Sequence, residues 1–155
     1  NFVMKRIFFV LVLLFSVLVI PNLVSAQVNL HGSGHLHAEG NGRATLIMQT
    51  GNVHVSGHGY LVIAIRDNAS IQLSGEGTCQ DYEHENLTVK RCRGFNGEAH
   101  VAGNGFAVRI QGHDIVLDAS GKGHARLRGE GWYETNSKSG SWSAEGQEVN
   151  ITDNS

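Results

Sequence analysis

Histidine is the residue type that most invites a chemical interpretation of this chain, because nine histidines occur among its 155 residues. His35 and His37 are two residues apart and His54 and His58 four apart, so each pair shares one face of an extended strand. Neutral imidazole is a common metal ligand. If consecutive strands pair as hairpins, however, no two histidines lie side by side across strands. We therefore expect a solvated polar face without metal or cofactor, on which His35 and His37 are only weak candidate ligands.

No pattern in the sequence is typical of an enzyme. The Gly-x-Ser-x-Gly motif is absent, and Ser56 and Ser74 precede glycines within strands, not at a strand-to-helix elbow. Asp114 and Asp118 are candidate paired carboxylates for glycoside cleavage, but Asp114 fits a turn and Asp118 an exposed strand position. No helix follows the Gly-x-Gly pairs, so they are not dinucleotide fingerprints. We expect no enzyme and assign no catalytic residue.

The two cysteines, Cys79 and Cys92, lack the spacing of a zinc site. In an exported chain an even pair of this kind favours a disulfide. Closing a loop of about 14 residues stabilises a fold by on the order of 3 kcal/mol. We expect the polar segment 81–90 to loop out between the two cysteines.

Two further sets of residues are candidates for contact with sugars. Asn-x-Ser/Thr acceptors for N-glycosylation begin at Asn68, Asn86 and Asn150, which we place at a hairpin tip, in the disulfide loop and in a frayed tail over residues 147–155. Trp132 and Trp142 flank a short closing hairpin, where they either stack on a ligand or cap the end of the fold.

The segment 1–26 has the features of a signal peptide. Met4, the expected start of translation, precedes Lys5 and Arg6; a 14-residue apolar run follows, and small residues end at Ala26. The apolar run is shorter than the roughly 20 residues of a bilayer span. We expect residues 27–155 to form one secreted β-domain that meets a membrane only through this leader before cleavage. The alternative is a pilin-like subunit that retains the hydrophobic helix.

Charge argues against nucleic acid as a partner. Without Lys5 and Arg6, ten of the twelve Lys and Arg residues remain against 14 Asp and Glu. The domain is therefore mildly acidic, and we expect no basic stripe on it. Its length suffices for one hydrophobic core.

Alternation predicts β-strands throughout residues 35–77, where apolar or small residues occupy every second position. Glycine pairs interrupt the strands without changing which positions are apolar. They therefore predict bends in extended chain, not reversals. The pairs lie at 40–42, 57–59, 75–77 and 121–123.

Changes in alternation predict the chain reversals. We expect a two-residue hairpin at Gly51-Asn52, a three-residue loop at 67–69 and a tight turn near Gly112-His113. The predicted fold is a single antiparallel meander closing into a barrel or an orthogonal sandwich. The alternative is a β-solenoid, which is suggested by the nearly regular interval between glycine pairs, as from Gly42 to Gly59 and on to Gly77.

Tyr60, Val62 and Ala64 form an outward apolar stripe, which we take as a candidate subunit contact. With no chemistry in evidence, the leading interpretation is a secreted or cell-surface structural β-protein. It would be an envelope, matrix or extracellular filament subunit that associates with itself or with other envelope proteins. The alternative is an extracellular binding module for a glycan or a metal.

Overall fold

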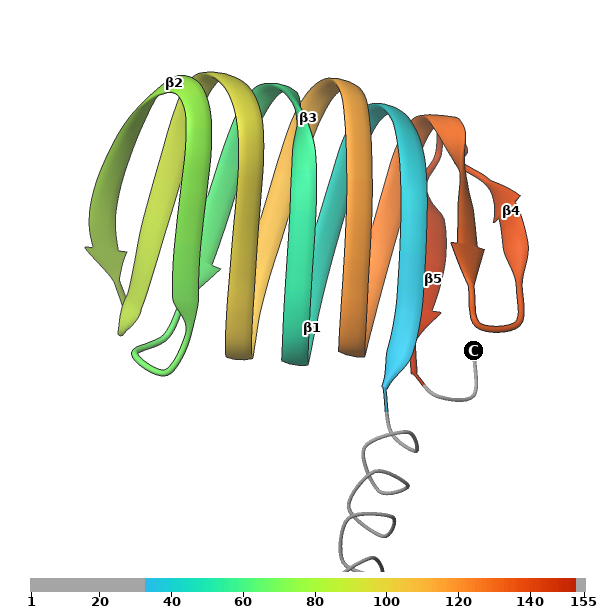
Figure 1. Cartoon of the computed structure of the whole chain (residues 1–155), viewed down its shortest axis with the longest axis horizontal. Coiled ribbons are helices and arrows are strands. Elements are labelled where there is room, and N and C mark those ends of the chain that lie inside the picture. Colours follow the sequence, from blue (N-terminus) through green and yellow to red (C-terminus); the bar gives the residue numbers. More distant parts are fainter. Residues whose placement is uncertain (1–32, 153–155) are drawn as a thin grey trace, which may run out of the picture. The chain divides into compact units, whose positions relative to one another are not determined.

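The computed structural model describes residues 33–152, which are all-β (Figure 1). The expected signal peptide at 1–26, and the pilin-like alternative, lie outside the described residues. Within the described part, no helix is long and apolar enough to cross a membrane. The strands are β1 (Gly34–Ile65), β2 (Ser70–His84), β3 (Leu87–Thr135), β4 (Ser139–Ser141) and β5 (Gln147–Ile151).

The long strands wind around one another as a coil. Leu36 of β1 pairs with Thr135 on one side and with Ala119 on the other, and Ala119 also pairs with Val53. Between Leu36 and Val53, β1 therefore completes one turn and returns to the same column of the sheet, with one segment of β3 between its successive turns. Figure 1 shows the strands arching over and returning behind. The nearly regular interval between glycine pairs, which suggested a solenoid, equals the length of one turn of this coil.

This arrangement is a single antiparallel sheet with the order β1-β3-β2, and it does not close into a barrel. The expected barrel or orthogonal sandwich is therefore wrong. Each turn of the coil satisfies its backbone hydrogen bonds with the next turn, so the two edges of the sheet need not meet.

The glycine pairs are bends within strands, as predicted. Gly42 illustrates why glycine is required there: its φ is +131°, and it lies between Gly112 and Gly129 on the neighbouring strands. A Cβ atom at Gly42 would overlap the carbonyl oxygen of Arg128. Stacked glycines therefore let adjacent strands bend at the same place and divide the coil into two faces.

The predicted hairpin at Gly51-Asn52 is wrong, because both residues lie inside β1. Met48 and Val53 both face the core, and between them the strand bends and changes which positions point inward. Their partners in β3, Phe106 and Val101, change in the same way, so the register continues through the bend. The change of alternation therefore marked a place where β1 and β3 bend together. It did not mark a hairpin at which the strand ends.

The turn at 67–69 is present, and Ala69 N donates to the carbonyl oxygen of Arg66 at 3.1 Å. It does not join neighbouring strands, however, because β3 lies between β1 and β2. A hairpin at this loop would have paired Ile65 with Ile71, but Ile65 pairs with Thr88, and Ile71 with Val101.

The predicted turn near Gly112-His113 is also wrong, since β3 runs through it. Gly40 is opposite Ile115 whereas Gly42 is opposite Gly112, so β3 holds one extra residue in this bend. Asp114, with a φ of +53°, takes up this residue, and its backbone N–H donates to Asn41 Oδ1 at 2.9 Å.

Segment 81–90 does not loop out. It is a β2–β3 hairpin whose two-residue tip, Glu85-Asn86, has positive φ angles of 48° and 66°. Residues 147–151 are not frayed either, because they form β5 and pair with residues 123–127 of β3. The closing hairpin is confirmed, with Trp132 opposite Ser141.

The hydrophobic core fills the inside of the coil, and its two ends differ. At the β4 and β5 end, Trp142, Val149 and Ile151 are buried. At the β2 end, the core-facing Ile71 and Leu73 are only partly buried. One end of the coil is therefore capped by its own chain and the other is not.

Candidate functional site

Because the strands are in register, outward side chains line up in columns across the sheet. On the face that carries residues 35–39, one column reads Glu134, His37, Asp118, His54 and His100. We call it the histidine column. His37 Nδ1 lies 2.6 Å from Asp118 Oδ1, and His37 Nε2 lies 3.1 Å from Glu39 Oε1. The hydrogen bond with Asp118 is the main cause that raises the pKa of His37 above its usual value; partial burial opposes the rise, and the hydrogen bond with Glu39 adds to it.

Histidines do pair across strands, contrary to expectation. The His54 and His100 rings are 6.1 Å apart, and those of His58 and His113 stack at 5.0 Å. The sequence reasoning missed both pairs because it gave β1 the wrong neighbour. Within residues 33–152, no cluster of three His, Cys, Asp or Glu residues could hold a metal ion. His35 is exposed, and its backbone N–H donates to Asn136 Oδ1 at 2.9 Å.

The two tryptophans have different environments. Trp132 is 43% exposed and its ring lies 5.1 Å from that of His37. Trp142 is buried, and its Nε1–H donates to the carbonyl oxygen of Trp132 at 3.1 Å. A groove of about 450 Å³ runs beside Trp132 and is also lined by Glu39, Asp114 and Glu130. Ligand stacking therefore stays a prediction for Trp132, while Trp142 belongs to the cap.

All three glycosylation candidates are exposed. Asn68 lies in the turn after β1 and Asn86 at the tip of the β2–β3 hairpin. Asn150 lies in β5, and its Oδ1 is 3.0 Å from Nδ1 of His124. Their modification stays a prediction.

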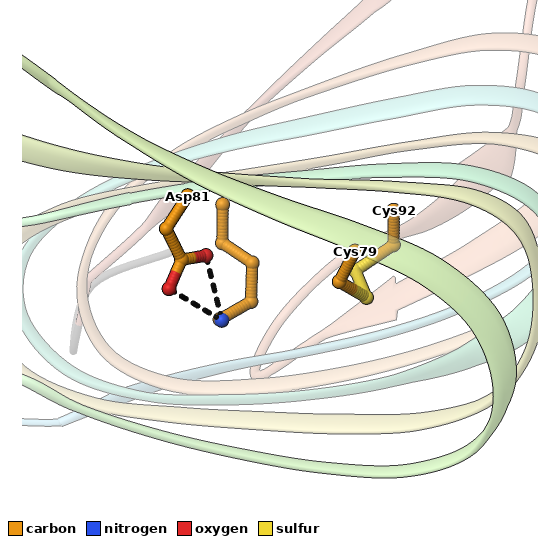
Figure 2. Close-up of a disulfide and its surroundings, with 4 residues drawn as sticks. Cys79, Asp81 and Cys92 are labelled. Carbon is orange, nitrogen blue, oxygen red and sulfur yellow. Dashed lines mark hydrogen bonds and ion pairs between the residues drawn. A yellow bond between two sulfur atoms is a disulfide. The ribbon is translucent and has the colours of Figure 1, made fainter.

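The disulfide between Cys79 and Cys92 is confirmed. It joins directly opposite residues of β2 and β3, whose Cα atoms are 4.0 Å apart. On the same side of the hairpin, Lys90 Nζ donates to both carboxylate oxygens of Asp81, at 2.7 and 3.0 Å (Figure 2). A covalent bond and an ion pair therefore fasten β2 to the rest of the sheet.

The second face of the coil carries the predicted apolar stripe, but among different neighbours. Tyr60 is opposite Gln111, and Ala64 lies between Ala107 and Val89. Val62 lies between Arg109 and Arg91. A meander of consecutive strands would have set the stripe between polar or charged residues of 39–43, including Arg43, and of 72–76, so that expectation is wrong. Instead the stripe is interleaved with arginines.

These arginines form a basic surface that the sequence analysis did not expect. One row reads Arg126, Thr45, Arg109, Val62 and Arg91 across five adjacent strands. Beside it lie Arg43, Arg128 and Arg93, each two residues along a strand from a member of the row. We call this surface, Arg43, Arg91, Arg93, Arg109, Arg126 and Arg128, the arginine face.

A signal for this face was present in the sequence. Arg-Cys-Arg-Gly at 91–94 is followed by Arg-Ile-Gln-Gly at 109–112 and Arg-Leu-Arg-Gly at 126–129, at nearly equal intervals. Each interval equals one turn of the coil, so the repeat places its first arginines on one line. Net charge concealed this pattern, because Asp and Glu outnumber Lys and Arg over the whole sequence.

The fold and these surfaces define a disulfide-bonded, coiled antiparallel β-protein with one histidine-rich acidic face and one arginine face. No protein-family model, curated protein or solved structure matches the chain.

Proposed function

We propose that this chain is a secreted or cell-surface structural β-protein, a subunit of an envelope, matrix or extracellular filament, that acts through protein–protein contacts. The observation that carries the proposal is the open edge of β2. This 15-residue strand pairs with β3 on one side only. A long unpaired edge offers a row of backbone donors and acceptors to another strand.

The two ends of the coil support this assignment of the contact. The β4 and β5 end finishes in strands of three and five residues that cover buried side chains, which is a common way to protect an edge. β2 contains neither lysine nor proline, the residues that most often block edge pairing. Its core-facing Ile71 and Leu73 stay partly exposed, so a further strand would bury them.

The occupant that fits this edge best is β2 of a second copy. Antiparallel pairing about the middle of the strand would set Asp81 and Glu83 near the apolar half of the partner strand, and no two carboxylates would be directly opposite. Such a contact is self-complementary and gives a closed two-fold dimer, so a larger assembly would be built from further contacts of this dimer.

The proposal is tested by sedimentation of the purified chain over a range of concentrations. We expect wild-type protein to associate and Leu73→Glu to weaken association by tenfold or more, because pairing would bury the new carboxylate directly opposite Asp81 of the second copy. Ile65→Glu is the matched control, since Ile65 is also a partly buried residue packed on the core but lies outside β2. A wild-type chain that stays monomeric at all concentrations, or an equal loss in both variants, would contradict the proposal.

A further inference from the structure

We propose that the arginine face binds a linear acidic glycan through carboxylate or sulfate groups spaced along the polymer. This surface is distinct from the open edge of β2, and its function goes beyond assembly. The two proposals can fail independently.

The spacing of the arginines fits a polymer with a regular charge. Arg91, Arg109 and Arg126 lie on successive turns of β3, and a single β1 strand separates each from the next. Strands in a sheet are about 4.8 Å apart, so these arginines recur at roughly 9.5 Å. That distance is comparable to the length of one disaccharide. A glycan that carries one acidic group per disaccharide would therefore meet one guanidinium at each repeat.

The surface is hollowed at both ends of this row. At one end a depression of about 310 Å³ is lined by Arg43, Arg109, Arg126 and Arg128, together with His124 and Glu148. At the other end a depression of about 260 Å³ is lined by Arg91, Arg93 and neighbours from β2. Guanidinium groups hold carboxylate and sulfate in a bidentate manner, and Val62 between the hollows offers an apolar surface to a sugar ring.

The charges of this face are not balanced within the protein. Among the described residues, its one ion pair with a carboxylate joins Arg126 Nε to Glu148 Oε1 at 3.4 Å. Arg43 is directly opposite Arg128, an arrangement of like charges that destabilises a sheet. Arg43 Nη2 donates to Gln111 at 3.0 Å, but Arg43 Nε is buried without a hydrogen-bond partner. The repulsion between these like charges and the buried donor without a partner both cost free energy and bring no structural gain. Such costs are typical of a binding surface.

Nucleic acid fits this face less well. A duplex carries one phosphate per about 1.7 Å of its axis, far denser than one arginine per roughly 9.5 Å. Single strands bind through exposed aromatic rings on which bases stack. Here Tyr60 is half-buried, and the guanidinium of Arg91 lies over the ring of Tyr82, 4.6 Å from its centroid.

Binding is tested with the purified chain and four probes: hyaluronate, which carries carboxylates only; chondroitin sulfate, which carries carboxylates and sulfates; neutral dextran; and duplex DNA. We expect one or both acidic glycans to bind and dextran not to bind. In Arg109→Gln/Arg126→Gln the dissociation constant should rise by about tenfold or more, because two charge-assisted contacts are lost. Arg109→Lys/Arg126→Lys should also bind more weakly than wild type, because lysine keeps the charge but not the bidentate geometry.

The control variant is Arg66→Gln/Lys122→Gln, which makes the same change in net charge at exposed positions away from the row. Its affinity should stay within about twofold of wild type, a difference well below one lost contact. Thermal melts establish that each variant is folded. No binding to either acidic glycan at low salt, an equal loss in the control, or tighter binding to DNA than to both glycans would overturn the proposal.

Discussion

At the scale of single residues, hydrogen bonds to two carboxylates raise the pKa of His37. His37 lies between Asp118 and Glu39, whose hydrogen bonds favour its charged form. A group whose pKa is raised on folding stabilises the folded state fully below its unfolded pKa. This contribution is lost as pH rises through the folded pKa.

We therefore expect His37→Gln to lower the free energy of unfolding at pH 5.5 and to have a smaller effect at pH 9. The difference should be below about 1 kcal/mol, because the side chains involved are exposed to solvent. Urea denaturation at both pH values measures it. His35→Gln is the control, since no ion pair of His35 occurs in the described part of the chain. A destabilisation by His37→Gln that grows with pH would contradict this assignment.

At the scale of elements, the glycine bends hold the coil together. Gly42 combines a φ of +131° with neighbouring backbone that leaves no room for a Cβ atom. We expect Gly42→Ala to destabilise the fold by about 3 kcal/mol, through backbone strain and overpacking combined. Chemical denaturation followed by circular dichroism measures the effect.

Gly94→Ala separates these two causes. Gly94 has a φ of +60°, but nothing lies within 4 Å of the position its Cβ would take. The substitution should therefore cost only about 1 kcal/mol, the penalty of a left-handed backbone alone. If both substitutions cost the same, close approach of the strands is not what requires glycine at position 42.

The sequence predicted the elements better than their partners. Alternation around Leu36, Leu46 and Val55 revealed the strands and the core, and unbroken alternation through Gly42 correctly indicated a bend. Partners could not be predicted because they lie far away in the sequence: Leu46 pairs with Val108 and Ala125. Local sequence patterns favour pairing with the nearest strand in the chain. The change of alternation before Val53 looks the same in the sequence whether two paired strands bend together or a hairpin forms.

The surfaces depend on these partners, so sequence reasoning reached them only in part. It found that Val62 points outward but gave it polar neighbours, whereas Arg91 and Arg109 flank it. The arginine repeat was visible in the sequence. That it places the arginines on one line could be inferred only once the length of one turn of the coil was known. The disulfide between Cys79 and Cys92 was predictable because an exported chain with two cysteines and no zinc-site spacing allows only this pairing.

At the scale of the whole molecule, both the open edge of β2 and the arginine face follow from one arrangement, in which every turn of β1 lies between two turns of β3. Cross-strand nuclear Overhauser effects between backbone protons test it most directly. The account predicts contacts from Leu46 to both Val108 and Ala125, and from Val53 to both Val101 and Ala119. Contacts between Met48 and Val55, as in a hairpin at Gly51-Asn52, would contradict it.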